Sequence, residues 1–314
     1  MNRRAQVLCI ALLTTTAGPV AAEVRPSDLV RPANAASYGP GYGRRVTSYQ
    51  LEIGAFSGSA GDEDRFAVVP LIRVTQPVRS DEVELIWGFS GFSRSGPAAE
   101  NPEQSVDQSS VRLANPYLCY QWVWRELPYQ IRVGAGLTAP LATLRTEKSA
   151  DTLVDLEALA ITQAMHGMQE FFLWTPETIS QVIHVDAYMR HHFGLVWGGQ
   201  ANLANQYGFN DDYGNGYQFA AEVDLELAFE LDWARFAVRG IYFTAPTSDA
   251  DDTDQISVEP DLRFRLGAVD LFVRYTLPID EPFGFGLDDG KVWGAHIGVS
   301  TPTERHLPAA PKAK

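Results

Sequence analysis

Charged residues recur at every second position in parts of this sequence, which is the spacing that places side chains on one face of a β-strand. The clearest acidic row is Glu222, Asp224 and Glu226, and Arg263 and Arg265 form a basic row. If such rows face each other across an enclosed space, they produce a transverse electric field. Rings of charge of this kind are how pores discriminate between ions.

A second group of residues suggests hydrolytic chemistry, because Ser180, His184 and Asp186 share one face of a predicted strand. Residues four apart in a strand are roughly 13 Å apart, so Ser180 cannot reach His184 and only the pair His184 and Asp186 can interact. The sequence holds no Gly-rich phosphate loop, no Cys-x-x-Cys pair and no His-Glu-x-x-His helix. It therefore predicts no enzymatic activity, no metal site and no cofactor.

The elements that carry these residues are strands, because apolar and polar residues alternate repeatedly from about residue 45. Between Tyr217 and Phe229, seven apolar residues alternate with a largely acidic set, which excludes a helix there. The same pattern predicts twelve strands, each about as long as the 9–11 tilted residues that a bilayer requires. They lie near residues 46–58, 65–76, 82–92, 111–124, 129–139, 180–190, 193–204, 216–231, 235–245, 255–266, 268–278 and 291–300.

The connections between these strands alternate in length. Tight joints near residues 126–128, 190–192, 232–234 and 266–268 are separated by longer polar loops at 59–64, 93–110, 140–178, 205–215, 246–254 and 278–290. An even number of strands with short turns at one end and long loops at the other is typical of a transmembrane β-barrel. We therefore predict an all-β fold, an antiparallel barrel of about twelve strands.

One short helix is predicted in the long loop at 140–178. Thr152 and Asp155 have the spacing of a capping box, an apolar stripe follows at helical spacing, and Gly167 is a candidate helix end. The sequence leaves open whether this segment enters the barrel as a constriction or packs across its mouth.

The two ends of the chain differ from the region between them. Residues 1–22 have the pattern of a signal peptide, with Arg3 and Arg4 before an apolar run and a cleavage site after Ala22. Residues 23–44 are predicted to be a flexible periplasmic leader, 45–300 the barrel, and 301–314 a flexible tail. The net charge of −14 argues against a nucleic-acid partner.

The last predicted strand, at residues 291–299, resembles the barrel-insertion signal: a polar residue, then Gly294, then apolar residues one apart. Over residues 45–300 the chain thus resembles the bacterial outer-membrane β-barrel (porin-like) class, although fourteen residues follow Ser300. The resemblance implies a place in the outer membrane, with its lipids and the barrel-insertion machinery as partners. It also implies aromatic side chains at the membrane interfaces, with Trp87, Trp122, Trp124, Trp197, Trp233, Tyr275 and Trp293 as candidates.

In such a barrel the charged faces line the lumen. The residues predicted to set its charge selectivity are Glu52, Arg73, Arg132, Glu222, Asp224, Glu226, Glu259, Asp261, Arg263, Arg265 and Arg274. The expected function is a channel for passive diffusion of small polar solutes through a narrow charged lumen, in which the acidic row faces Arg263, Arg265 and Arg274. The alternatives are a closed structural or adhesive surface barrel that acts through its acidic loops, and an exported soluble β-sandwich. The acidic loop residues at 210–212, 249–254 and 288–289 could bind divalent cations or be simply solvated.

Overall fold

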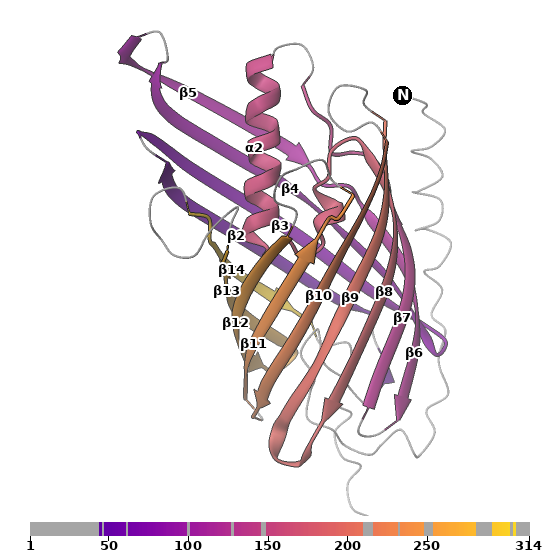
Figure 1. The fold of residues 1–314 in the computed structure, drawn as a ribbon. Helices are drawn as coiled ribbons and strands as arrows, with labels where there is room; N and C mark the ends of the chain where they lie inside the picture. The colour runs from indigo at the N-terminus through magenta and orange to yellow at the C-terminus, as the bar shows by residue number, and fades with distance from the viewer. Residues whose placement is uncertain are drawn as a thin grey trace, which may run out of the picture.

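A computed structural model describes residues 44–45, 47–60, 62–98, 101–126, 129–145, 149–209, 216–231, 233–247, 254–280, 291–301 and 304–305. Twelve antiparallel strands form a closed barrel (Figure 1). The strands are β2 (Ser48–Ala60), β3 (Glu63–Val78), β4 (Asp81–Ala98), β6 (Tyr117–Glu126), β7 (Tyr129–Thr138), β8 (Thr178–Arg190), β9 (Leu195–Gly208), β10 (Gly216–Glu230), β11 (Ala234–Thr244), β12 (Asp254–Leu266), β13 (Val269–Pro278) and β14 (Gly294–Ser300).

The barrel closes where its first and last strands pair. β14 lies antiparallel to β2, with Ile297 opposite Ile53, so that the ring has no open edge at this seam. The predicted signal peptide, the predicted leader except Arg44, and most of the predicted tail lie outside the described residues. Two short strands flank the barrel in the sequence, β1 (Arg44–Arg45) and β15 (Glu304–Arg305). They pair with each other.

Apolar side chains face outward and charged side chains face inward, the reverse of a water-soluble protein. On β10, Leu225 is 71% exposed and Leu227 is 58% exposed, whereas Asp224, before Leu225, is 1% exposed and Glu226, between the two leucines, is 4% exposed. The alternation read from the sequence therefore places the charged face inside. Within the described residues, no helix is long and apolar enough to cross a membrane.

The predicted number of twelve strands in the barrel is confirmed, and most strand ends differ from the predictions by a few residues. The strand predicted at 111–124 is correct only from Tyr117, because residues 114–116 are not in a strand and residues 111–113 end the strand before them. The long loop predicted at 93–110 is wrong, because β4 continues to Ala98 and pairs with an additional strand, β5 (Asn101–Leu113), that lies outside the ring. The two strands form a hairpin that extends beyond the rest of the wall (Figure 1). The loop predicted at 59–64 is also shorter, because β2 runs to Ala60 and β3 begins at Glu63.

The predicted helix is present as α2 (Ser149–Met165), and it packs against β3, β4 and β5. It begins earlier than the predicted capping box, so Thr152 lies within the helix rather than at its N-cap, and its hydroxyl donates to the carbonyl of Arg145. Gly167, with a φ of +62°, follows the helix end. A Cβ at this glycine would meet Ile241 and Thr276 at 2.9 Å, so the chain passes here against the inner wall.

The chain between β7 and β8, residues 139–177, therefore enters the barrel, and we call it the lumenal segment. After α2 it contains a short 3₁₀ helix, η2 (Phe171–Leu173), whose three residues are buried together with Trp174. The sequence left open whether this segment constricts the lumen or covers the mouth. The structure places its buried turn inside.

Asn115 fixes the lumenal segment to the wall at the break between β5 and β6. Its side-chain amide donates to the carbonyls of Phe172 and Thr175, at 3.3 and 2.7 Å, and its oxygen accepts from the amides of Leu141 and Ala142, both at 2.8 Å. The side chain is fully buried. Because buried polar groups must be paired, this one residue satisfies four main-chain groups of the lumenal segment.

Substituting Asn115→Ala is expected to remove one hydrogen bond from each of those four main-chain groups and to cost on the order of 3 kcal/mol of stability. We expect a lower melting temperature and faster proteolysis within the lumenal segment, measured on folded protein in detergent. Asn205→Ala is the matched control, because Asn205 accepts an exposed hydrogen bond from the Tyr217 hydroxyl. Equal melting temperatures for the two variants would contradict this role of Asn115.

Candidate functional site

The interior of the barrel is the candidate site, because its charged side chains are buried away from the apolar outer face and from solvent. Each occupies an inward position set by the two-residue period of its strand. Glu222, Asp224 and Glu226 of β10 are at most 4% exposed, and they lie opposite Phe243, Ile241 and Arg239 in the register with β11. Burying such charges without partners would cost several kcal/mol each. The arginines of the neighbouring strands provide these partners.

Two arginines of β11 pair with Glu226 and Asp224 of the acidic row, whereas Glu222 accepts hydrogen bonds from Gln200 and the Glu170 amide. Arg239 lies 3.1 Å from Glu226, 3.7 Å from Asp224 and 3.0 Å from Glu259. Arg235, which is fully buried, pairs with Glu226 and lies 3.5 Å from Glu230. The row therefore faces Arg235 and Arg239, and not Arg263, Arg265 and Arg274 as the sequence suggested. The reason is the strand register. Side chains on adjacent strands lie directly beside one another, as Glu226 and Arg239 do, so they pair more readily than side chains on opposite walls of the lumen.

The three expected arginines have other partners. Arg274 on β13 pairs with Glu52 on β2 and lies 3.5 Å from Glu259, so it connects three strands. Arg263 contacts Asp261 at 3.0 Å, within the same strand. Arg265 lies 3.8 Å from Glu230.

The remaining predicted lumen residues also lie inside. Arg132 on β7 lies 3.1 Å from Asp186 and 3.7 Å from Glu82. Arg73 on β3 lies 3.0 Å from Glu84 and also pairs with Glu170 of the lumenal segment. All eleven predicted lumen residues are thus buried or largely buried within the barrel, in ion pairs or in hydrogen bonds.

The lumenal segment reaches both walls with its polar residues. Gln169 donates to Asp224 at 3.1 Å, and the main-chain amide of Glu170 donates to Glu222 at 2.9 Å. The carboxylate of Glu170 pairs with Arg73 on the opposite wall. Burial raises the pKa of Glu170 above its ordinary value, and the nearby Arg73 opposes this shift.

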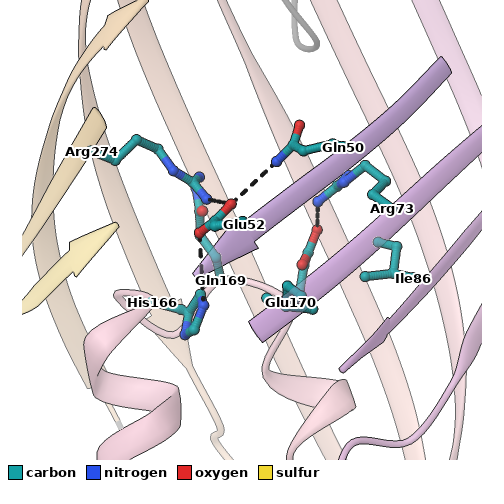
Figure 2. A pocket seen from close by; sticks show the side chains of 9 residues that line it. Gln50, Glu52, Arg73, Ile86, His166, Gln169, Glu170 and Arg274 are labelled. Atoms are coloured by element: carbon teal, nitrogen blue, oxygen red, sulfur yellow. Dashed lines mark hydrogen bonds and ion pairs between the residues drawn. The ribbon is translucent and has the colours of Figure 1, made fainter. Parts of the chain in front are cut away.

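A pocket remains where the lumenal segment meets β2 and β3 (Figure 2). Polar side chains dominate its lining, and its size suits a single water molecule. The lining residues are Gln50, Glu52, Leu71, Arg73, Ile86, His166, Gln169, Glu170 and Arg274.

The proposed hydrolytic set does not assemble. His184 lies 3.0 Å from Asp186 and 2.7 Å from Asn202, as the strand spacing allowed. The Ser180 hydroxyl instead accepts from the Gln206 amide at 3.2 Å. The acidic loop residues at 210–212, 249–253 and 288–289 lie outside the described residues.

The predicted interface aromatics are on the outer surface or near its rims. At the short-turn end, Trp122, Trp124, Trp197 and Trp233 are 45–57% exposed. At the opposite end, Trp293 stacks on Tyr275 with ring centroids 5.5 Å apart. Trp87 lies farther from the ends, opposite Ile72, and its indole N–H donates to the carbonyl of Ala114 at 3.1 Å.

Sequence reasoning missed the residues that hold the lumenal segment, namely Asn115, His166 and Gln169, as well as His296 and the role of Arg235. For His296 a signal was present, because it alternates with Ala295, Ile297 and Val299, whose apolar side chains form the outward face of the strand. For the other four residues no signal was present, because their contacts join separate segments that no local pattern relates.

Comparison with known proteins identifies the fold. No family model matches this sequence, and no curated protein matches it. The structure is similar to an outer membrane channel from Pseudomonas putida F1, with a TM-score of 0.53 and 10% identity over 89% of this chain and 99% of that chain. The NanC porin aligns with a TM-score of 0.48 and 11% identity, over 81% of this chain and 98% of that chain. The fold of this chain is therefore that of the outer-membrane β-barrels.

Proposed function

We propose that this protein is an outer-membrane channel through which small polar solutes diffuse passively, and that the lumenal segment narrows its charged lumen. The observation that carries the proposal is the closed barrel, whose strands have an apolar outward face and a charged inward face. An apolar outer face suits lipid, and charged inner walls favour water and polar solutes. Outer-membrane lipids and the barrel-insertion machinery would be its partners in the cell.

The contacts at the tip of the lumenal segment support a passage rather than a solid core. Gln169 and Glu170 reach the walls through hydrogen bonds and an ion pair, and water can replace such contacts at a small net cost. The apolar residues of the segment, including Phe172 and Trp174, lie on the side held by Asn115. The polar tip is thus the part of the constriction that can yield to a solute.

A closed structural barrel that acts through its acidic loops is the second candidate, and one observation favours it. Near the short-turn end, Arg235 and Arg263 are at most 1% exposed and are surrounded by carboxylates. Twelve strands lie between the eight whose interior side chains can fill and the sixteen that leave an open channel. Conductance measurements separate the two candidates.

Replacing residues 141–176 with a short Gly/Ser linker is expected to raise single-channel conductance severalfold, because it removes the constriction and leaves the wall intact. The ends of β7 and β8 can be joined directly, since the Ser180 amide donates to Thr138 at 2.8 Å. The measurement is conductance in planar bilayers, on protein shown to be folded by its heat-dependent mobility in gels.

Leu153→Ala is the control for this experiment, because Leu153 lies on α2 with 60% of its surface exposed and should not affect conductance. Equal conductance for the folded deletion variant and the wild type would show that the lumenal segment does not limit the passage. Silence from both would exclude the channel and favour the closed barrel.

The double substitution Glu222→Gln and Asp224→Asn is expected to reduce preference for cations over anions, because the buried wall carries more carboxylates than guanidinium groups. These two acids are the best targets in the row, since their closest contacts come from Glu170, Gln169 and Gln200 rather than from an arginine. The measurement is the reversal potential across a salt gradient.

The matched control is Glu63→Gln with Asp64→Asn, which removes two acids at the tip of the β2–β3 hairpin. An unchanged reversal potential in the lumen variant, or an equal shift in the control, would contradict a selective role for the acidic row.

A further inference from the structure

Three buried side chains converge where the lumenal segment meets the seam of the barrel. Glu52 on β2, His296 on β14 and His166, just after α2, each expose 5% or less of their surface. The Nδ1 atom of His296 lies 2.9 Å from Oε1 of Glu52, and the Nε2 atom of His166 lies 4.0 Å from the same oxygen. Figure 2 shows His166 directed at Glu52. Apart from this close approach of His296 to Glu52, none of the three atoms has a hydrogen-bond partner among the described residues.

Hydrogen bonds on the far side of each ring fix where its proton lies. His166 Nδ1 is 2.9 Å from the carbonyl oxygen of Thr162, and His296 Nε2 is 2.8 Å from that of Met165. Carbonyl oxygens only accept, so both of these nitrogens are donors. In the neutral tautomers the opposite nitrogens therefore direct lone pairs at the carboxylate. Three acceptor atoms facing one another in a buried site repel, and either a proton or a metal ion between them removes this repulsion.

Two glycines make this arrangement possible. A Cβ at Gly54 would lie 2.8 Å from Nδ1 of His296, and a Cβ at Gly294 would lie 2.1 Å from the carbonyl oxygen of Met165 and 2.5 Å from His296 Nε2. Any side chain at Gly294 would thus displace the carbonyl that orients the ring. The two glycines therefore leave room for the His296 ring and for the carbonyl of Met165 to which it donates.

The donor set matches a divalent transition metal. Two imidazole nitrogens and one carboxylate oxygen are a recurrent zinc ligand set, which leaves a fourth position for water. Bonds of 2.0–2.2 Å in a tetrahedral site separate the donors by about 3.4 Å, and the 2.9 and 4.0 Å separations here bracket that value. Metal-binding histidines usually donate their other N–H to a carbonyl or carboxylate, as both do here.

The surroundings leave one carboxylate oxygen available. Arg274 contacts Oε2 of Glu52, and Oε1 faces the two histidines. The pocket lined by Gln50 and Gln169 adjoins the cluster and can supply the water for the fourth position. The three donor atoms all lie within 4.8 Å of one another.

We propose that Glu52, His166 and His296 bind one divalent transition metal ion, with Zn²⁺ as the best match. The ion would join the lumenal segment to β2 and β14, the two strands whose pairing closes the barrel. It would therefore stabilise the seam and the constriction together. This proposal concerns the fold of the interior and does not depend on solute passage.

The test uses untagged full-length protein, folded in detergent, stripped with EDTA, and then titrated with Zn²⁺. We expect one bound zinc per chain by elemental analysis and a rise in melting temperature on zinc addition. His166→Ala and His296→Ala should each weaken zinc binding by at least about tenfold and abolish the rise. His184→Ala is the matched control, because this histidine also contacts a lumenal carboxylate, Asp186, but lies outside the cluster.

Equal zinc content in the wild type and in folded His166→Ala and His296→Ala would overturn the proposal. So would the absence of bound zinc in the wild type, which would instead assign a proton shared between Glu52 and His296. If the variants fail to fold, binding of Co²⁺ to the metal-free wild-type protein tests the site. Visible absorption bands of four-coordinate Co²⁺ with nitrogen and oxygen ligands support the site, and their absence overturns it.

Discussion

The cost of placing charge inside a barrel is the constraint on which the rest of this structure depends. Lipid requires an apolar outer face, so the two-residue period of the strands directs the charged side chains of the alternating wall into the lumen. There each charge must be paired or hydrated. Arg239, which reaches Asp224, Glu226 and Glu259, shows how one guanidinium satisfies three carboxylates from two strands. The wall of the barrel and its ion pairs therefore form together.

The lumenal segment obeys the same constraint in a different way. Its apolar residues bury one another against the wall at the level of Asn115, and its polar tip completes the pairing of Arg73, Glu222 and Asp224. The segment is thus fixed at one end by hydrogen bonds to its main chain. At the other end it is held by contacts that water can replace. Under the proposed function, this division would let one element fill the barrel and still yield to a polar solute.

Much of the wall could be predicted from the sequence because alternation is a local signal, as the row from Glu222 to Glu226 shows. The β4–β5 hairpin was missed because residues 93–110 are rich in serine, proline and charge and carry no apolar face. A hairpin that extends beyond the wall of the barrel does not require an apolar face, because it does not contact lipid. The partners of the charges could not be predicted either, since Arg235 and Arg239 meet the acidic row through register. Glu52, His166 and His296 lie far apart in the sequence, and only barrel closure and the path of the lumenal segment bring them together.

The most direct test of the central claim is single-channel recording of the folded wild-type protein in a planar bilayer, with different salt concentrations on the two sides. A charged lumen narrowed by the lumenal segment predicts stable, small conductance steps, with a reversal potential displaced toward that of the cation. Silence from protein that is demonstrably folded and inserted would contradict a conducting lumen and would leave a closed barrel filled by its own ion pairs.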